Sequence, residues 1–225
     1  MKSKRKNVMR KTQLEAMSRP EVVVFDLGKV LVDFDYSIAA RRIAARSTMP
    51  PRDIQHFIDH SPVLIRYETG LMTRQQFFDE IRKTTGFLGD IEEFGQFFAD
   101  IFSPMDEMIA LHARLRQHGV PAFIFSNTND LAIAHIRHNF PFFANFDDYV
   151  FSYEHGAMKP DAKLYEVVER VTGRKGKQIL YLDDRIENVQ AGTARGWHVI
   201  QHQAANASIA EVERLGLLPK ILAAG

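Results

Sequence analysis

The sequence predicts an α/β fold: a doubly wound, Rossmann-like parallel sheet with a small all-helical insert. Two observations predict it. Short apolar runs alternate with helical patterns, as in parallel-sheet proteins, and one long stretch after the first run has helical periodicity only. The apolar runs are residues 21–25, 120–125, 146–151 and 178–182, with a weaker run at 197–201. The helical patterns between them are 107–118, 129–139, 162–172 and 186–194.

The first apolar run, 21–25, is continuous rather than alternating, which is typical of a strand buried on both faces of a parallel sheet. It stops at the turn sequence Asp-Leu-Gly, 26–28. Three of the predicted helices are followed by a glycine, where a left-handed residue commonly ends a helix. These glycines are Gly119, Gly173 and Gly196.

The stretch 36–103 has no clear strand and is predicted to form a helical cap inserted into the α/β core. Nine of the 17 Phe lie between Phe34 and Phe102, which indicates an aromatic core for this insert. We predict that residues 66–70 form a loop before a helix capped by Thr73. The predicted cap helices are 37–46, 51–59, 73–84 and 91–102. The core then consists of 20–35 and 104–225.

The net charge of +1 is the sum of two unlike parts. Residues 1–20 hold seven of the 29 basic and one of the 28 acidic residues, which leaves 22 basic against 27 acidic ones, a net of −5. Residues 1–19 are therefore expected to be a basic, disordered tail. The tail lacks the apolar segment of a secretory signal, and no apolar run is long enough to span a bilayer. We expect a cytoplasmic protein with no membrane or nucleic-acid partner, either a monomer or a homodimer.

The absence of Cys excludes a thiol nucleophile and a cysteine-ligated metal centre. Polar side chains instead follow the predicted strands directly: Asp26, Ser126 and Asp183, with Asp184 beside the last. Because the carboxyl ends of parallel strands lie along one edge of a sheet, we expect these side chains to converge there. Three carboxylates together repel one another without a cation, and oxygen ligands suit Mg²⁺. The pattern predicts a magnesium-dependent phosphoryl site.

Four segments in order resemble the motifs of the haloacid dehalogenase-like (HAD) hydrolase superfamily. They are Phe25-Asp-Leu-Gly-Lys-Val-Leu-Val-Asp33, Phe125-Ser-Asn-Thr128, Met158-Lys-Pro-Asp161 and Tyr181-Leu-Asp-Asp-Arg-Ile-Glu-Asn188. The first looks most like a subgroup similar to the bacterial glucose-1-phosphate phosphatases. The resemblance covers almost everything after Arg19, and the predicted insert matches the position of that superfamily's smaller cap domain.

The resemblance implies a role for each matching residue. Asp26 becomes the nucleophile of an aspartyl-phosphate intermediate, with Lys159 as the second catalytic residue that neutralises it and the phosphate. Ser126 and Asn127 hold the phosphoryl group. The implied Mg²⁺ ligands are Asp26, the backbone carbonyl of Gly28, Asp183 and Asp184. The implied activity is hydrolysis of a small phosphorylated metabolite, such as a sugar phosphate.

Gly28 departs from the family pattern, which has at this position a second aspartate that protonates the leaving oxygen and activates water. General acid–base help is worth about 10²–10⁴-fold, so three functions stay open. The first is a phosphatase in which Lys29, Asp33, Asp35 or a cap residue substitutes. The second is a metal-independent 2-haloacid dehalogenase, whose first motif also lacks this aspartate. The third is a catalytically weak phosphate-binding or regulatory protein. We expect Lys29, Arg66 and Tyr67 to contact the substrate.

Overall fold

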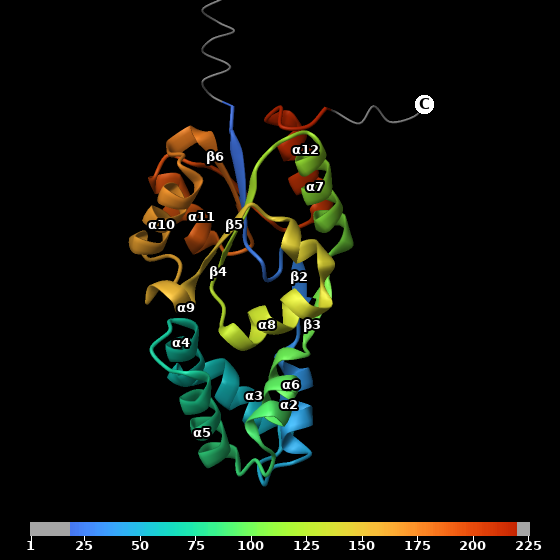
Figure 1. The fold of residues 1–225 in the computed structure, drawn as a ribbon, viewed down its shortest axis with the longest axis vertical. Coiled ribbons are helices and arrows are strands. Elements are labelled where there is room, and N and C mark those ends of the chain that lie inside the picture. The colour runs from blue at the N-terminus through green and yellow to red at the C-terminus, as the bar shows by residue number, and fades with distance from the viewer. Residues whose placement is uncertain (1–18, 220–225) are drawn as a thin grey trace, which may run out of the picture.

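The computed structural model describes residues 19–219, and the predicted basic tail lies outside this range except for Arg19. Its centre is a five-stranded, entirely parallel sheet with the strand order β5-β4-β1-β6-β7, as Figure 1 shows. The strands are β1 (Val22–Phe25), β4 (Ala122–Ser126), β5 (Asp148–Phe151), β6 (Ile179–Asp183) and β7 (His198–Gln201). All five predicted strands are therefore present, with β1 in the middle of the sheet.

Helices cover both faces of the sheet, with α7 and α12 on one side and α10 and α11 on the other in Figure 1. Alternate residues of β1 explain the two layers. Val23 and Phe25 pack with α7, α8 and α12, whereas Val22 and Val24 pack with α10. The core helices are α7 (Asp106–Gln117), α8 (Asp130–Asn139), α9 (Ser152–His155), α10 (Ala162–Thr172), α11 (Ile186–Ala194) and α12 (Ala205–Arg214). Two short 3₁₀ segments complete the core, η1 (Pro141–Asn145) and η2 (Gly176–Gln178). The α/β fold class is confirmed.

The insert forms a helical cap with its own apolar interior, drawn below the sheet in Figure 1. Phe77, Phe78, Phe87, Phe94 and Phe98 are at most 3% exposed, so the phenylalanine-rich stretch forms a packed core. The helices are α2 (Tyr36–Ala44), α3 (Pro51–His60), α4 (Pro62–Glu68), α5 (Arg74–Thr85) and α6 (Ile91–Ala99). The predicted cap of Thr73 is present, because its hydroxyl accepts from the Gln76 backbone while the Gln76 side chain accepts from the Thr73 backbone.

Three features differ from the sequence prediction. Residues 66–70 are not a loop throughout, since α4 runs to Glu68. Helix α6 ends at Ala99 instead of continuing to residue 102, because Phe102–Pro104 forms β3, which pairs antiparallel with β2 (Val32–Phe34) at the junction of cap and core. Helices α4, α9 and α12 were not predicted. The two short strands have three residues each, too few to show a period.

Side chains of the core and the cap meet at the N-terminus of α8. The Arg74 guanidinium of the cap donates to Asp130 Oδ2 at 2.9 and 2.7 Å, and the Tyr67 hydroxyl donates to Asp130 Oδ1. A second contact joins α4 to α9, where Ser152 Oγ donates to the Glu68 carbonyl at 2.5 Å. These contacts fix the orientation of α4 over the carboxyl edge of the sheet.

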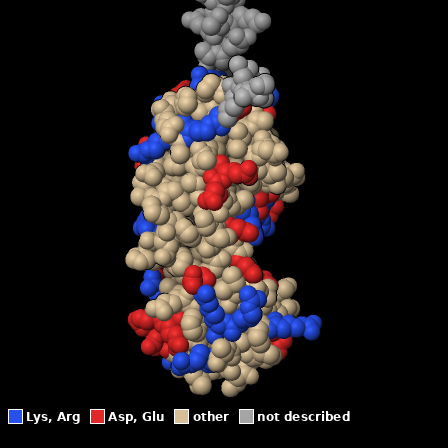
Figure 2. Space-filling view, turned by 90° about the vertical axis from the view of Figure 1, so that its right-hand side faces the viewer, with Lys and Arg blue, Asp and Glu red and all other residues tan. Residues whose placement is uncertain are grey.

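Acidic and basic side chains are interspersed on the surface. In the face shown in Figure 2, basic side chains gather over the cap with acidic ones directly beside them. Two of the cap's arginines form ion pairs, Arg42 with Asp100 at 2.8 Å and Arg46 with Glu93 at 3.0 Å. Within residues 19–219, no helix has the length and apolar character that a membrane span requires.

The aromatic core of the cap gives a stability prediction. Phe94 is fully buried and its ring centroid lies within about 6 Å of those of Phe77, Phe78, Phe87 and Phe98. Phe94→Ala should lower the free energy of unfolding by about 3–5 kcal/mol, measured by equilibrium denaturation. Leu88, which is 77% exposed, supplies the control: Leu88→Ala should change stability by less than about 0.5 kcal/mol. Equal losses for both variants would contradict a packed aromatic core.

Candidate active site

The carboxyl ends of the three central strands bring the site together. Asp26 directly follows β1, while Ser126 and Asp183 are the last residues of β4 and β6. Phe25 is in register with Ile124 on one side and Leu182 on the other. The side chains of Asp26, Ser126 and Asp183 therefore reach the same edge although they are far apart in sequence, as predicted.

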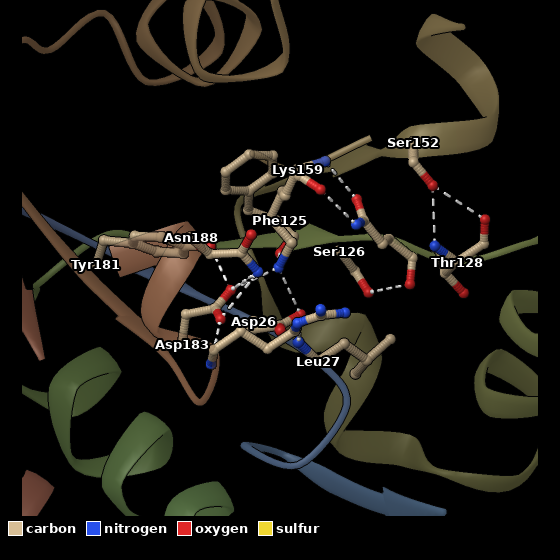
Figure 3. A network of polar contacts seen from close by, with 12 residues as sticks. Asp26, Leu27, Phe125, Ser126, Thr128, Ser152, Lys159, Tyr181, Asp183 and Asn188 are labelled. Carbon is tan, nitrogen blue, oxygen red and sulfur yellow. Dashed lines mark hydrogen bonds and ion pairs between the residues drawn. The ribbon is translucent and has the colours of Figure 1, made fainter. Parts of the chain in front are cut away.

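A buried lysine joins the two aspartates. Lys159 enters from the loop between α9 and α10, and its Nζ lies 2.9 Å from Asp26 Oδ1 and 2.7 Å from Asp183 Oδ2 (Figure 3). The ammonium also donates to the Phe125 carbonyl at 2.9 Å. Its side chain is only 1% exposed, so solvent screens these ion pairs very little. Lys159 thus interacts favourably with both carboxylates, but its single positive charge offsets only one of their two negative charges.

Asn127 holds the loop that carries Lys159. Its side-chain Oδ1 accepts from the Lys159 backbone N–H at 2.7 Å, and its Nδ2 donates to the Lys159 carbonyl at 3.1 Å. The side-chain amide predicted to hold phosphate is therefore engaged with the backbone of Lys159. The neighbouring Ser126 is 2% exposed, and its hydroxyl donates to the Asn127 carbonyl at the long distance of 3.4 Å.

Three carboxylates form a candidate metal site. One oxygen each from Asp26, Asp183 and Asp184 lies within 4.8 Å of the others. The Asn188 side chain donates to Asp183 at 3.0 and 3.1 Å, and its own Oδ1 is buried without a hydrogen-bond partner. An all-oxygen donor set with an unpartnered buried oxygen fits Mg²⁺. The residues that would hold the ion are Asp26, Asp183, Asp184 and Gly28 through its backbone, and Asn188 lies beside them.

The pKa shifts follow from burial and from Lys159. Burial raises the pKa of Asp26 and outweighs the ammonium of Lys159, which lowers it. Burial alone would also raise the pKa of Asp183. Its pKa is nevertheless below the usual range, because it is lowered by Lys159, the Tyr181 hydroxyl and the Arg185 backbone N–H. Burial, with the nearby Asp183 charge, raises the pKa of Asp184. Burial therefore disfavours the ionised forms of Asp26 and Asp184, and a cation bound between the carboxylates would favour them.

A cavity of about 210 Å³ opens onto these groups between the core and the cap. It is lined by Asp26, Gly28, Lys29, Phe34, Tyr36, Leu64, Glu68, Asn127, Met158, Lys159, Asp184, Arg185 and Asn188. An adjoining cavity of about 60 Å³ reaches Ser126 and shares Gly28, Phe34, Tyr36, Glu68 and Asn127 with the first. A larger cavity of about 420 Å³ lies between α6 and α8 and contains none of the three carboxylates.

Of the three predicted substrate residues, one lines the site cavity and two do not. Lys29 lines the cavity, where it forms an ion pair with Asp33 and lies 4.6 Å from the centre of the Phe34 ring. Arg66 is exposed and does not line either site cavity. Tyr67 also lies outside them, because its ring stacks on Phe77 and its hydroxyl contacts the core. Neither Arg66 nor Tyr67 thus lines a site cavity, and their contact with substrate stays a prediction.

Glu68 is the cavity residue that sequence reasoning missed. It lies within residues 66–70, the segment singled out from the sequence, but only the course of α4 shows which side chain of that segment faces the site. Burial raises the pKa of Glu68 to about 7, although a hydrogen bond with the Asn129 side chain acts against this. Tyr36 faces the same space, and burial raises the pKa of its phenol well above the ordinary value.

Comparisons with known proteins agree with this geometry. Residues 20–196 match the family model of the haloacid dehalogenase-like hydrolases. A HAD family enzyme from Bacteroides thetaiotaomicron, solved in complex with magnesium and inorganic phosphate, is 21% identical with a TM-score of 0.72, over 82% of this chain and 95% of that one. The L-2-haloacid dehalogenase from Xanthobacter autotrophicus is 19% identical with a TM-score of 0.60, over 89% of this chain and 85% of that one.

A HAD-like family hydrolase from Porphyromonas gingivalis is 21% identical with a TM-score of 0.73, and the match covers 87% of this chain and 98% of that one. At these identities the structural matches establish the fold alone. With the family model spanning most of the chain, they identify the protein as an α/β-core hydrolase with a helical cap. The chain belongs to the haloacid dehalogenase-like hydrolase family.

The space beside Gly28 gives a second prediction. A Cβ at this position would lie 2.8 Å from Phe34 Cε1, so the ring occupies the room that a side chain needs. Gly28→Ala should lower the free energy of unfolding by about 1–3 kcal/mol, as overpacking substitutions do. In a Phe34→Ala background, Gly28→Ala should lower the free energy of unfolding by a smaller amount. A double-mutant cycle by denaturant unfolding measures this coupling, and equal costs in both backgrounds would contradict it.

The buried carboxyl of Glu68 gives a third prediction. Burial raises its pKa from 4.5 unfolded to about 7 folded, so the folded protein binds this proton more tightly. The free energy of unfolding therefore falls as pH rises through this interval. Glu68→Gln removes that dependence, so its stability relative to the unsubstituted protein should rise by about 3 kcal/mol across the interval.

Denaturant unfolding at several pH values measures the difference. Glu80→Gln on α5, outside both site cavities, is the matched control. A difference that does not change with pH, or one that Glu80→Gln reproduces, would show that Glu68 titrates normally.

Proposed function

We propose that this protein is a magnesium-dependent phosphatase that hydrolyses a small phosphorylated metabolite, such as a sugar phosphate, through an aspartyl-phosphate. The observation that carries the proposal is the convergence of three carboxylates around one buried ammonium. When ionised, the three carboxylates carry three negative charges against the single positive charge of Lys159, so the set calls for a further cation. Phosphoryl transfer through an aspartyl-phosphate needs a carboxylate nucleophile beside positive charge that stabilises the transferring group.

Each residue then has a defined task. Asp26 attacks phosphorus and forms the covalent intermediate, which water later hydrolyses. The Ser126 hydroxyl and the backbone after β4 bind phosphoryl oxygens, while the Asn127 side chain keeps Lys159 in place. Lys159 stabilises the charge of the nucleophile and of the phosphoryl group. Mg²⁺, held by Asp26, Asp183, Asp184 and the Gly28 carbonyl, supplies further charge stabilisation when bound.

The size of the site is consistent with a metabolite-sized substrate. A cavity of about 210 Å³ has room for a phosphate and a small organic group. The related enzyme from Bacteroides thetaiotaomicron in complex with magnesium and phosphate lends support to the same ligands here. The subgroup similar to glucose-1-phosphate phosphatases, a cytoplasmic location and the domain boundaries at 36 and 103 are part of the proposal.

Removal of the nucleophile tests the proposal. The purified protein with Mg²⁺ should hydrolyse p-nitrophenyl phosphate and members of a panel of sugar phosphates. Chelation of the metal should abolish this activity, and added Mg²⁺ should restore it. Asp26→Asn should lower kcat by at least about 10³-fold, as loss of a covalent nucleophile does. Asp106→Asn, on the exposed first residue of α7, is the control that should retain activity.

A 2-haloacid dehalogenase is the second candidate, favoured by Gly28 and by the fold similarity to the Xanthobacter autotrophicus enzyme. It would release halide from 2-chloropropionate without added metal. The cluster of three carboxylates argues against it, because a metal-independent site leaves their repulsion uncompensated. Phosphate binding without turnover of any ester would instead indicate the phosphate-binding or regulatory protein.

A further inference from the structure

The core of this protein has no carboxyl group at the position where the family places its acid–base aspartate. Gly28 stands there, and the Phe34 ring fills the space beside it. The proton that a phosphatase gives to its leaving oxygen must then come from another side chain that faces the same cavity. This inference rests on the proposed phosphatase function.

The nearby candidates on the core side are engaged elsewhere. Lys29 is paired with Asp33 and donates to the Phe34 carbonyl at 3.1 Å. Asp33 also accepts from the Phe34 backbone N–H at 2.8 Å, and Asp35 caps α2 by accepting from the Ser37 backbone at the same distance. Neither Asp33 nor Asp35 lines the site cavities. Their hydrogen bonds lower the pKa of both carboxyls, which makes them poor proton donors.

Glu68 faces the site from the cap. It lines the larger site cavity together with Asp26, Gly28 and Lys159, and it lines the adjoining cavity together with Gly28 and Ser126. Glu68 is the only cap carboxylate within residues 19–219 that lines either of these two cavities. The cap therefore supplies a carboxyl group opposite the nucleophile.

The position of Glu68 is fixed by a contact of its own backbone and by the close approach of Gly70 to the core. Ser152 Oγ donates to its backbone carbonyl and accepts from the Thr128 backbone N–H at 2.9 Å, so one hydroxyl ties α4 to the loop after β4. Two residues later, Gly70 passes so close to the core that a Cβ there would lie 2.1 Å from the Tyr153 carbonyl oxygen. Catalytic groups need such support to hold a productive geometry.

We propose that Glu68 is the general acid and base of this phosphatase. As Asp26 attacks phosphorus and the bond from phosphorus to the leaving oxygen breaks, the protonated Glu68 carboxyl gives its proton to that oxygen. The resulting carboxylate takes a proton from the water that attacks the aspartyl-phosphate, which releases phosphate, frees Asp26 and restores protonated Glu68. A carboxyl with a pKa near 7 is suited to both steps.

The other charged or titratable side chains lining the larger site cavity are Asp26, Lys29, Tyr36, Lys159, Asp184 and Arg185.

The test compares two esters that differ in their need for a proton. Nitrophenolate leaves p-nitrophenyl phosphate readily without protonation, whereas the alkoxide of glycerol 3-phosphate or a sugar 6-phosphate does not. Glu68→Gln should lower kcat/KM for the alkyl phosphate by about 10²–10⁴-fold and for the aryl phosphate by less than about tenfold. The unsubstituted protein should lose alkyl phosphatase activity above about pH 7, and Glu68→Gln should lack this decline.

Two further variants separate catalysis from structure. Glu68→Asp keeps the carboxyl and should recover part of the alkyl phosphatase activity, while Glu80→Gln should behave like the unsubstituted protein with both esters. Equal losses on both esters, or no loss on the alkyl phosphate, would overturn the assignment of Glu68 while leaving the phosphatase intact. If the unsubstituted protein hydrolyses neither ester, the proposed function fails and this inference fails with it.

Discussion

The contact on which the site depends is the buried ion pair of Lys159 with Asp26 and Asp183. An ammonium that is 1% exposed has almost no solvent to stabilise it, so both carboxylates are needed to keep it charged. Conversely, burial disfavours the ionised form of both aspartates, and the ammonium counters this. Removal of one partner from such a buried pair typically costs about 3–5 kcal/mol. The residues of the candidate active site are thus also part of what holds that site together.

The parallel sheet makes this contact geometrically feasible. Because β1 lies between β4 and β6 in register, Asp26 and Asp183 come to the same edge, and the loop after β5 and α9 has only to bring Lys159 across it. The Asn127 side chain fixes that loop by bonding both the N–H and the carbonyl of Lys159. A residue expected to bind phosphate through its side chain therefore acts first on the position of the lysine.

The cap has a core of its own and also positions side chains at the site. Its aromatic interior gives α2–α6 a core of their own, and the contacts of Tyr67 and Arg74 with Asp130 orient α4 over the sheet edge. Tyr67, expected to contact substrate, instead anchors the cap. Its neighbour Glu68 points into the cavity as a result. In the proposed mechanism, Glu68 of the cap supplies the carboxyl that the core lacks at Gly28.

The sequence by itself determined the order of strands and helices along the chain, the position of the helical insert, and the residues at the strand ends. These depend on local patterns: continuous apolar runs, glycine after helices and polar residues at the ends of buried strands. Gly28 was visible in the same way, as a missing side chain. The short β2–β3 pair, the extent of α4, the ring of Phe34 beside Gly28 and the direction of Glu68 were decided only by the tertiary structure. Each of these depends on packing between segments that are distant in sequence, as between Ser152 and Glu68, and no local period encodes such contacts.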